Sequence, residues 1–202
     1  MATEIEVKAH VQNIDVIKDR LYEKAEYSGA FEKRDVYWFG RGTSDLTTTK
    51  LRVRKEKRSF ANGNERSRCL VTYKAKEENN GIEINDELEF EVEPVDAFEE
   101  FLVKAGLRAG AGKIKRGWVF IKGEITAELV EVDGLGWFVE LEILARASPD
   151  DANAEGNYEK TLTKAKETLL AFLDSLGIGR EAIERRFYLD MLSSGDQGTG
   201  AC

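Results

Sequence analysis

The sequence predicts an α+β fold in which a closed antiparallel β-barrel of about eight strands surrounds a charged lumen, or tunnel, and is flanked by amphipathic helices. Several segments alternate charged and apolar residues, as strands with one polar and one apolar face do. The charges are also separated by strand into acidic and basic pairs, whereas a solvent-facing sheet usually mixes both signs. Since amphipathic helices would cover the apolar faces, the charged faces are left for the inside of the barrel.

The first strand is predicted at the N-terminus, where E-I-E-V-K places Glu4, Glu6 and Lys8 on one face. Two neighbouring carboxylates repel each other unless a cation lies between them, and hard divalent ions such as Mg²⁺ take oxygen ligands of this kind. A lysine beside them could meet a phosphate as a point charge. The alternative is an ordinary exposed strand, which an isolated short motif more often signifies.

The same alternation predicts further strands whose charged faces each carry one sign. In chain order these faces carry Arg52 and Arg54; Lys74 and Lys76; Glu87, Glu89, Glu91 and Glu93; Lys113 and Lys115; and Glu140 and Glu142. Because a closed sheet would turn all of these faces inward, we expect the cations to converge with Lys8 on one anion site. Some acidic side chains between residues 87 and 93 would only pair with lumen lysines, and the sequence assigns no separate role to Glu87, Glu89 or Glu91.

Apolar residues at helical spacing predict three helices, over about residues 14–25, 98–105 and 158–176. Asn13 is a candidate cap for the first, and Asp96 with Glu99 resembles a capping box at the start of the second. Gly106 and Gly177 follow the second and third helices as end signals. We expect turns at 62–64 and 79–81 and a loop over 147–156.

Composition indicates one domain with a sizeable core, since 42% of the 202 residues are hydrophobic. We predict this domain over residues 1–192 and a flexible tail over 193–202. A net charge of −8 argues against a general nucleic-acid binder. No uncharged run is long enough for a membrane helix, and no signal peptide is visible. With only Cys69 and Cys202, no disulfide framework is expected, so we predict a cytoplasmic protein and leave a homodimer open.

Three classes of chemistry have no candidate residues in this sequence. It contains no Cys/His cluster, no Ser-His-Asp order and no Gly-rich phosphate loop, which excludes zinc, triad and P-loop sites. The single histidine, His10, continues the parity of the first strand and is predicted at the rim rather than as a catalytic base. Trp118 and Trp137 lie in strand-like runs and are interpreted as packing groups.

Taken in order, these motifs resemble the CYTH superfamily, the triphosphate tunnel metalloenzymes, which include class IV adenylyl cyclases and thiamine triphosphatases. The resemblance covers about residues 4–192. It rests on E-x-E-x-K at the start, D-V-Y-W at 35–38, L-R-V-R at 51–54, the paired-lysine strand, E-L-E-F-E-V-E at 87–93, G-L-G-W-F-V-E-L-E at 134–142 and R-F-Y-L-D-M-L at 186–192.

The resemblance implies an enzyme that acts on ATP, inorganic triphosphate or thiamine triphosphate with Mg²⁺ or Mn²⁺. The length and the 134–142 hairpin look most like the class IV cyclases, which convert ATP to cyclic AMP and pyrophosphate; a triphosphatase and a non-catalytic phosphate-binding domain are the alternatives. The implied metal ligands are Glu4, Glu6, Glu140 and Glu142. The implied substrate-binding residues are Lys8, Arg52, Arg54, Lys74, Lys76, Lys113 and Lys115.

One position departs from the family pattern. The family usually has an Asp four residues before G-L-G, and this chain has Val130 there. Glu128 has the same strand parity as Val130, so it could take the place of that Asp after a shift of two residues. We therefore interpret Lys8 and Glu128 as the catalytic candidates. The departure is also the best support for the non-catalytic alternative.

Overall fold

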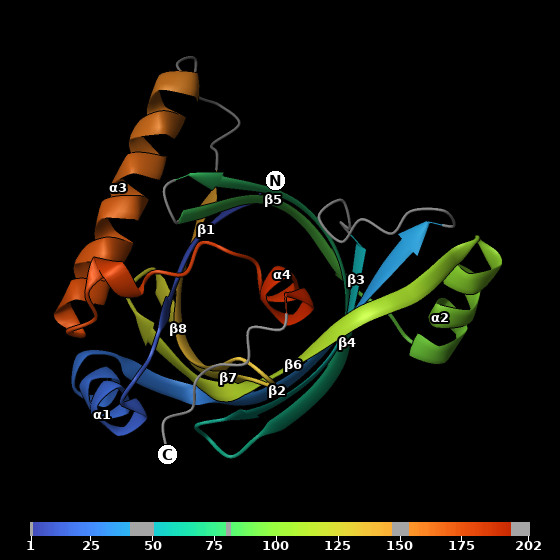
Figure 1. The fold of residues 1–202 in the computed structure, drawn as a ribbon, viewed down its shortest axis with the longest axis horizontal. Helices are drawn as coiled ribbons and strands as arrows, with labels where there is room; N and C mark the ends of the chain where they lie inside the picture. Colours follow the sequence, from blue (N-terminus) through green and yellow to red (C-terminus); the bar gives the residue numbers. More distant parts are fainter. Residues whose placement is uncertain (1, 41–50, 80–81, 147–153, 195–202) are drawn as a thin grey trace.

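The computed structural model describes residues 2–40, 51–79, 82–146 and 154–194, and within them eight antiparallel strands form a closed barrel (Figure 1). The side chains of residues 2, 74–79, 85–87, 146 and 154–158 lie outside this description. The order around the barrel is β1-β5-β4-β3-β2-β6-β7-β8, and β8 pairs back onto β1. The strands are β1 (Ala2–His10), β2 (Glu26–Gly40), β3 (Leu51–Phe60), β4 (Glu65–Asn79), β5 (Ile82–Glu91), β6 (Leu107–Lys122), β7 (Ile125–Val132) and β8 (Gly136–Arg146).

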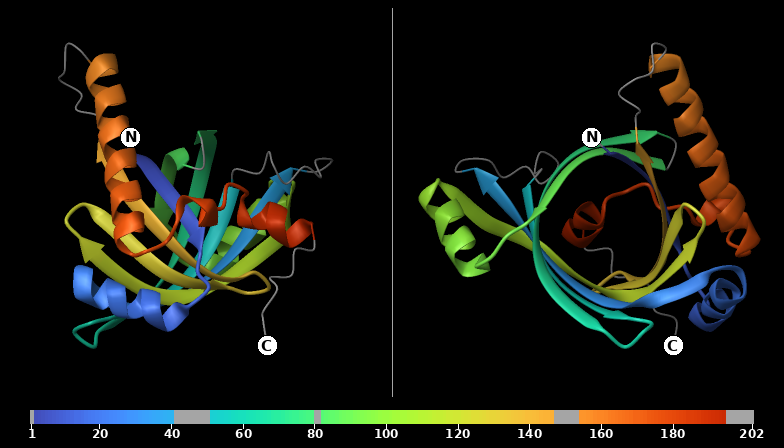
Figure 2. Two further views of the ribbon diagram at one scale, coloured as in Figure 1. Left: turned by 60° about the vertical axis from the view of Figure 1, so that its left-hand side comes forward. Right: turned by 180° about the vertical axis from the view of Figure 1, so that it is seen from behind.

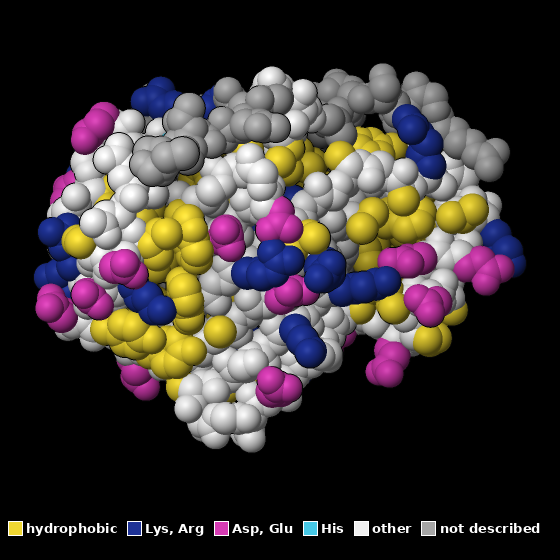
Figure 3. Space-filling view, turned by 60° about the horizontal axis from the view of Figure 1, so that its bottom comes forward, with side chains coloured by type: hydrophobic (Ala, Val, Ile, Leu, Met, Phe, Trp, Pro, Cys, Tyr) yellow, Lys and Arg dark blue, Asp and Glu magenta, His cyan; other side chains and the backbone are white. Residues whose placement is uncertain are grey.

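Strand alternation directs charge inward and apolar side chains outward, as the sequence predicts. On β1, Ile5 and Val7 are completely or almost completely buried in the main core, while Glu4, Glu6 and Lys8 line the lumen. The core therefore lies outside the barrel wall, between the strands and the helices. On the outer face shown in Figure 3, acidic and basic side chains are interspersed, in contrast to the separated signs of the lumen.

Two helices cover one side of the barrel and a third covers the other (Figures 1 and 2). Helices α1 (Ile14–Lys24) and α3 (Ala154–Ser175) pack with β1, β7 and β8 in the main core. Helix α2 (Val95–Lys104) packs through Leu102 on β2, β3 and β4. Among the described helices, none combines the length and apolar character needed to cross a membrane.

The helix signals are confirmed in part. The Asn13 side chain accepts a hydrogen bond from the backbone N–H of Val16 at 3.2 Å, so the predicted cap of α1 is confirmed. The predicted capping box of α2 is wrong, because Pro94 occupies the cap position and no side chain bonds there. Glu99 instead lies 3.4 Å from the ammonium of Lys55 on β3.

Of the predicted turns and loops, the turn at 62–64 is confirmed between β3 and β4. Gly63 adopts a φ of +84° in the turn between β3 and β4, where a side chain would be strained. Helix α3 begins at Ala154, so the last three residues of the predicted 147–156 loop are helical. Residues 147–153 and 80–81 of the predicted loop and turn lie outside the described residues.

The short helix α4 (Tyr188–Ser193) was not predicted, and it lies inside the ring of strands in both views of the barrel mouth (Figures 1 and 2). A 3₁₀ turn, Arg180–Ala182, and a bridge between Ala9 and Ile183 lead the chain from α3 across β1 toward it. Because α4 includes Ser193, the predicted tail starts too early; residues 195–202 lie outside the described chain.

Candidate active site

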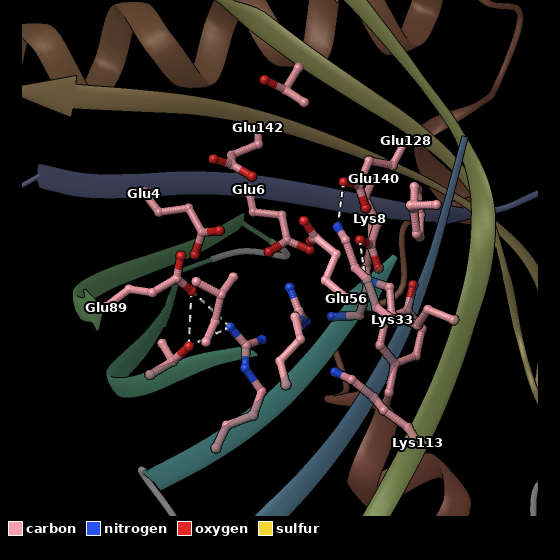
Figure 4. A pocket seen from close by; sticks show the side chains of 18 of the residues that line it. Glu4, Glu6, Lys8, Lys33, Glu56, Glu89, Lys113, Glu128, Glu140 and Glu142 are labelled. Carbon is pink, nitrogen blue, oxygen red and sulfur yellow. Dashed lines mark hydrogen bonds and ion pairs between the residues drawn. The ribbon is translucent and has the colours of Figure 1, made fainter. Parts of the chain in front are cut away.

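The lumen contains a cavity of about 390 Å³, which is within the usual size range of small-molecule sites (Figure 4). Its wall carries carboxylates from β1, β3, β5, β7 and β8 and cations from β1, β2, β3, β4 and β6. The structure thereby brings together most of the residues that the sequence singles out: Glu4, Glu6, Lys8, Arg52, Arg54, Lys113, Lys115, Glu128, Glu140 and Glu142. The side chains of the remaining two, Lys74 and Lys76, lie outside the described part of the chain.

An acidic row crosses three neighbouring strands. Glu6 on β1 is paired directly with Glu142 on β8 and with Glu83 on β5. Like charges directly opposite each other destabilise a sheet, so such a row calls for a cation. Lys8 meets part of this need, because its ammonium contacts the Glu83 carboxylate. Glu83 was not predicted from the sequence, although its parity with Glu87 and Glu89 on the same strand was the available signal.

Glu140 is the most constrained carboxylate of this wall. Its Oε2 lies 2.5 Å from the ammonium of Lys115. Burial alone would raise the pKa of Glu140, but the attraction of Lys115 holds it well below the ordinary value, so the carboxylate stays ionised. Its other oxygen, Oε1, and the phenol oxygen of Tyr188 are both buried without a partner at hydrogen-bond distance in the described structure. The two groups are still close enough that Tyr188 lowers the pKa of Glu140 and Glu140 raises the pKa of Tyr188.

The donor set fits a hard divalent ion. A buried carboxylate oxygen without a partner is available on Glu140, and Glu4, Glu6 and Glu142 point into the cavity beside it (Figure 4). Oxygen ligands of this kind suit Mg²⁺ or Mn²⁺. Among the described residues, no group of three or more acidic, histidine or cysteine side chains is arranged closely enough to hold a metal ion. If an ion binds here, Glu4, Glu6, Glu140 and Glu142 are the residues that would hold it.

The basic wall is built around Asp35 on β2. The Arg54 guanidinium donates to both of its carboxylate oxygens, at 2.7 and 2.9 Å. Arg52 and Lys113 approach the same carboxylate at 3.9 and 3.7 Å. Burial lowers the pKa of Lys113 to about 7, although Asp35 acts in the opposite direction. Asp35 was not predicted as a site residue, because its place in D-V-Y-W does not reveal which strands its side chain contacts.

Glu128 and Val130 are neighbours of equal parity on β7 with different surroundings. Glu128 lines the cavity, faces Glu140 across the β7–β8 ladder and lies 2.5 Å from the ammonium of Lys33. Val130 is completely buried in an apolar cluster with Phe138 and Tyr188. The position at which the family usually has an Asp is therefore packed against α4 in this chain.

The two minor sequence predictions concern aromatic and rim residues. His10 is 45% exposed, and its Nε2 lies 3.1 Å from Oε2 of Glu184, at the point where the C-terminal segment crosses β1. Trp118 and Trp137 stack on each other with ring centroids 5.6 Å apart, so their interpretation as packing groups is confirmed.

Comparison with known proteins gives relatives of matching length. The chain is 25% identical to a Methanocaldococcus jannaschii protein named "putative adenylate cyclase", covering 93% of this chain and 97% of that protein. A solved Pyrococcus horikoshii protein is 26% identical with a TM-score of 0.72, covering 95% and 98% of the two chains. A Hippeastrum adenylyl-cyclase-like protein, described as having dominant triphosphatase activity, has the same fold at 17% identity, with a TM-score of 0.60 and 96% of both chains covered. No family model matches the chain.

Proposed function

Because this chain belongs with the CYTH-like adenylyl cyclases in sequence and in fold, we propose that it is a metal-dependent enzyme that acts on a triphosphate. The observation that carries the proposal is that one cavity is lined by many carboxylates and many cations together. A triphosphate needs both, since its charge requires cations and its metal ion requires oxygen ligands.

The cations and the carboxylates have distinct tasks in the proposed reaction. The phosphates are bound and oriented by the cations Lys8, Arg52, Arg54, Lys74, Lys76, Lys113 and Lys115. Glu4, Glu6, Glu140 and Glu142 hold Mg²⁺ or Mn²⁺. When bound, such an ion withdraws charge from the reacting phosphoryl group. Catalysis then depends mainly on positioning and on charge stabilisation, because the fixed side chains need little reorganisation during reaction.

The specific activity proposed first is that of a class IV adenylyl cyclase. The 3′-oxygen of ATP forms a bond to the α-phosphorus, the bond from that phosphorus to the bridging oxygen breaks, and pyrophosphate leaves with the displaced electron pair. The 3′-hydroxyl proton has to be removed, and Glu128 at the cavity wall is the candidate acceptor. Lys8, the other catalytic candidate, would act as a cation that stabilises charge on the phosphates. The name of the M. jannaschii relative supports this assignment.

The second candidate is hydrolysis of inorganic or thiamine triphosphate, in which water attacks a terminal phosphorus. The site itself favours it, because the charged residues of the cavity suit phosphates and a metal ion and not a nucleobase. The Hippeastrum protein provides a precedent on this fold. A third possibility is triphosphate binding without turnover, for which the buried Val130 is the main support.

Product analysis separates these three functions. The protein is incubated with ATP, inorganic triphosphate or thiamine triphosphate, each with Mg²⁺ or Mn²⁺, and the products are resolved by chromatography. Cyclic AMP with pyrophosphate supports the cyclase, and orthophosphate without cyclic AMP supports the hydrolase. If no substrate is consumed but triphosphate raises the melting temperature, the binding function remains. If triphosphate neither reacts nor binds, all three are wrong.

A further inference from the structure

We propose that Asp35 is a positioning residue of this cavity, which holds Arg52, Arg54 and Lys113 from behind as their shared counter-ion, so that all three cations face a bound triphosphate. This inference rests on the proposed function, because it concerns the same anion site. It concerns a residue that would never touch the substrate.

The contacts of Asp35 connect three strands. Its partner Arg54 lies directly opposite it on β3, and Lys113 lies opposite it on the other side, on β6. The two-pronged contact with Arg54 fixes both the position and the plane of the guanidinium, which a single contact would not do. Arg52 and Lys113 also approach within 4 Å, so one carboxylate is shared by three cations. Arg52 is held as well by Thr72 Oγ1 at 2.9 Å and by Glu89 at 3.5 Å.

The exposed fractions of these side chains show which group lies nearer to the cavity. The Asp35 side chain is 0% exposed, whereas those of Arg52, Arg54 and Lys113 are 12%, 11% and 9% exposed. The three cations line the cavity and Asp35 does not. A carboxylate in front of the cations would compete with a bound anion. On the side away from the cavity, Asp35 offsets their mutual repulsion without occupying the space of a bound anion.

Lys113 depends most on this support. The groups that face it are Asp35 and Tyr37 on β2, Arg52 and Arg54 on β3, Lys115 on β6 and Tyr188 on α4. Burial and the neighbouring cations favour its neutral form, and Asp35 favours its charged form. Without the Asp35 charge, Lys113 would lose its proton at a lower pH and would no longer attract phosphate near neutral pH.

The test is Asp35→Asn, which keeps the shape of the side chain and removes its charge. Binding of inorganic triphosphate is measured by calorimetry in EDTA, which isolates the basic wall from metal-dependent turnover. We expect affinity to fall about tenfold or more at about pH 8, as is usual when an outer-layer partner of a site is removed. We also expect the loss to shrink toward about pH 6, where Lys113 regains its proton. Because the ligand has the same protonation state for both proteins at a given pH, the ratio of variant to parent affinity is independent of ligand protonation.

The matched control is Glu32→Gln, which removes an acidic partner of Arg34 and Arg116 from the outer face of the same strand. Its affinity should equal that of the parent. If Asp35→Asn does not fold, Asp35→Asn combined with Lys113→Met balances the charges. That double variant should bind no more tightly than Lys113→Met alone.

The outcomes distinguish the inference from the proposed function. Unchanged or tighter binding by Asp35→Asn, or a loss that is the same at every pH, would overturn the positioning role. Tighter binding by the double variant than by Lys113→Met would do the same. Failure of the parent protein to bind triphosphate, in EDTA and with Mg²⁺, would overturn the proposed function itself.

Discussion

The carboxylates of the lumen differ in what faces them. Glu83 and Glu140 each have a lysine ammonium within contact, whereas Glu6 lies between two other carboxylates across the sheet. Repulsion along this row is the physical reason for proposing that Glu6 shares a metal ion. An ion pair does not rule out that role, since Glu140 is both a partner of Lys115 and a proposed ligand.

We predict that Glu6→Gln abolishes metal-dependent activity and leaves the fold intact, because the change removes a proposed ligand charge and relieves repulsion along the acidic row. Activity assays with graded Mg²⁺ and circular dichroism measure the two effects. Glu131→Gln on β7, opposite Trp137 and outside the cavity lining, is the control and should behave as the parent does. Full turnover in excess EDTA would show that the metal assignment is wrong.

A second residue-scale prediction concerns Glu128. If it assists proton transfer, Glu128→Ala should lower kcat by about 10²–10⁴-fold, the usual contribution of acid–base assistance. Lys33→Met is the comparison, because Lys33 forms the 2.5 Å ion pair with Glu128. An equal loss in both variants would assign Glu128 to that ion pair alone, and activity equal to the parent's in Glu128→Ala would exclude it from catalysis.

At the scale of elements, α4 joins the C-terminal segment to the lumen. Tyr188 and Met191 pack there against Phe138 and Val130, so one part of an otherwise charged interior is apolar. The Tyr188 ring also lies 5.5, 5.2 and 5.5 Å from the ammonium groups of Lys8, Lys113 and Lys115. This short helix therefore bears on both the packing of the barrel and the basic wall.

We predict that Val130→Asp, which restores the usual family residue, destabilises this protein by about 3–5 kcal/mol, because it places a charge in a completely buried apolar cluster. Val130→Ala is the matched control and should cost about 2 kcal/mol, from lost burial and the cavity left behind. Chemical denaturation measures both. If Val130→Asp keeps parental stability and gains activity, the position belongs to the active site after all.

At the scale of the whole molecule, several buried carboxylates are held ionised by cations beside them. The pKa of Asp35, and likewise that of Glu140, lies well below its ordinary value, and Glu184 near Arg186 has a pKa of about 2. In the unfolded chain these groups take up protons at the ordinary values of 3.8 and 4.5. Their contribution to stability is therefore present above those values and is lost as pH falls through the lower folded values.

We predict that the free energy of unfolding decreases steadily from about pH 5 to about pH 3. Denaturant titrations at several pH values measure the slope. Glu140→Gln should be less stable than the parent at neutral pH, because it leaves Lys115 buried without its partner, yet its stability should depend less on acid. An unfolding free energy that stays constant across this range, or an unchanged slope in Glu140→Gln, would contradict the prediction.

The alternating pattern was enough to determine which face of each strand is charged, because side-chain direction follows directly from a period of two. It thereby identified Glu6, Arg54 and Lys113 for the lumen. The spacing of apolar residues likewise predicted the first helix, and Asn13 marked its start because a cap is a local interaction. These predictions succeeded because each depends on residues that are close together in the chain.

Only the tertiary structure decided which charged residues meet. Asp35 finds its partners 19 residues away on β3 and across β6, and Lys8 finds Glu83 from 75 residues away. These pairs depend on strand order and register, which the spacing of residues within one strand does not specify. The fate of Val130 likewise depends on α4, whose six residues are too few to show a helical period. Local alternation therefore determines which side chains face the lumen. Their partners are determined by the closure of the barrel and by the position of the C-terminal segment.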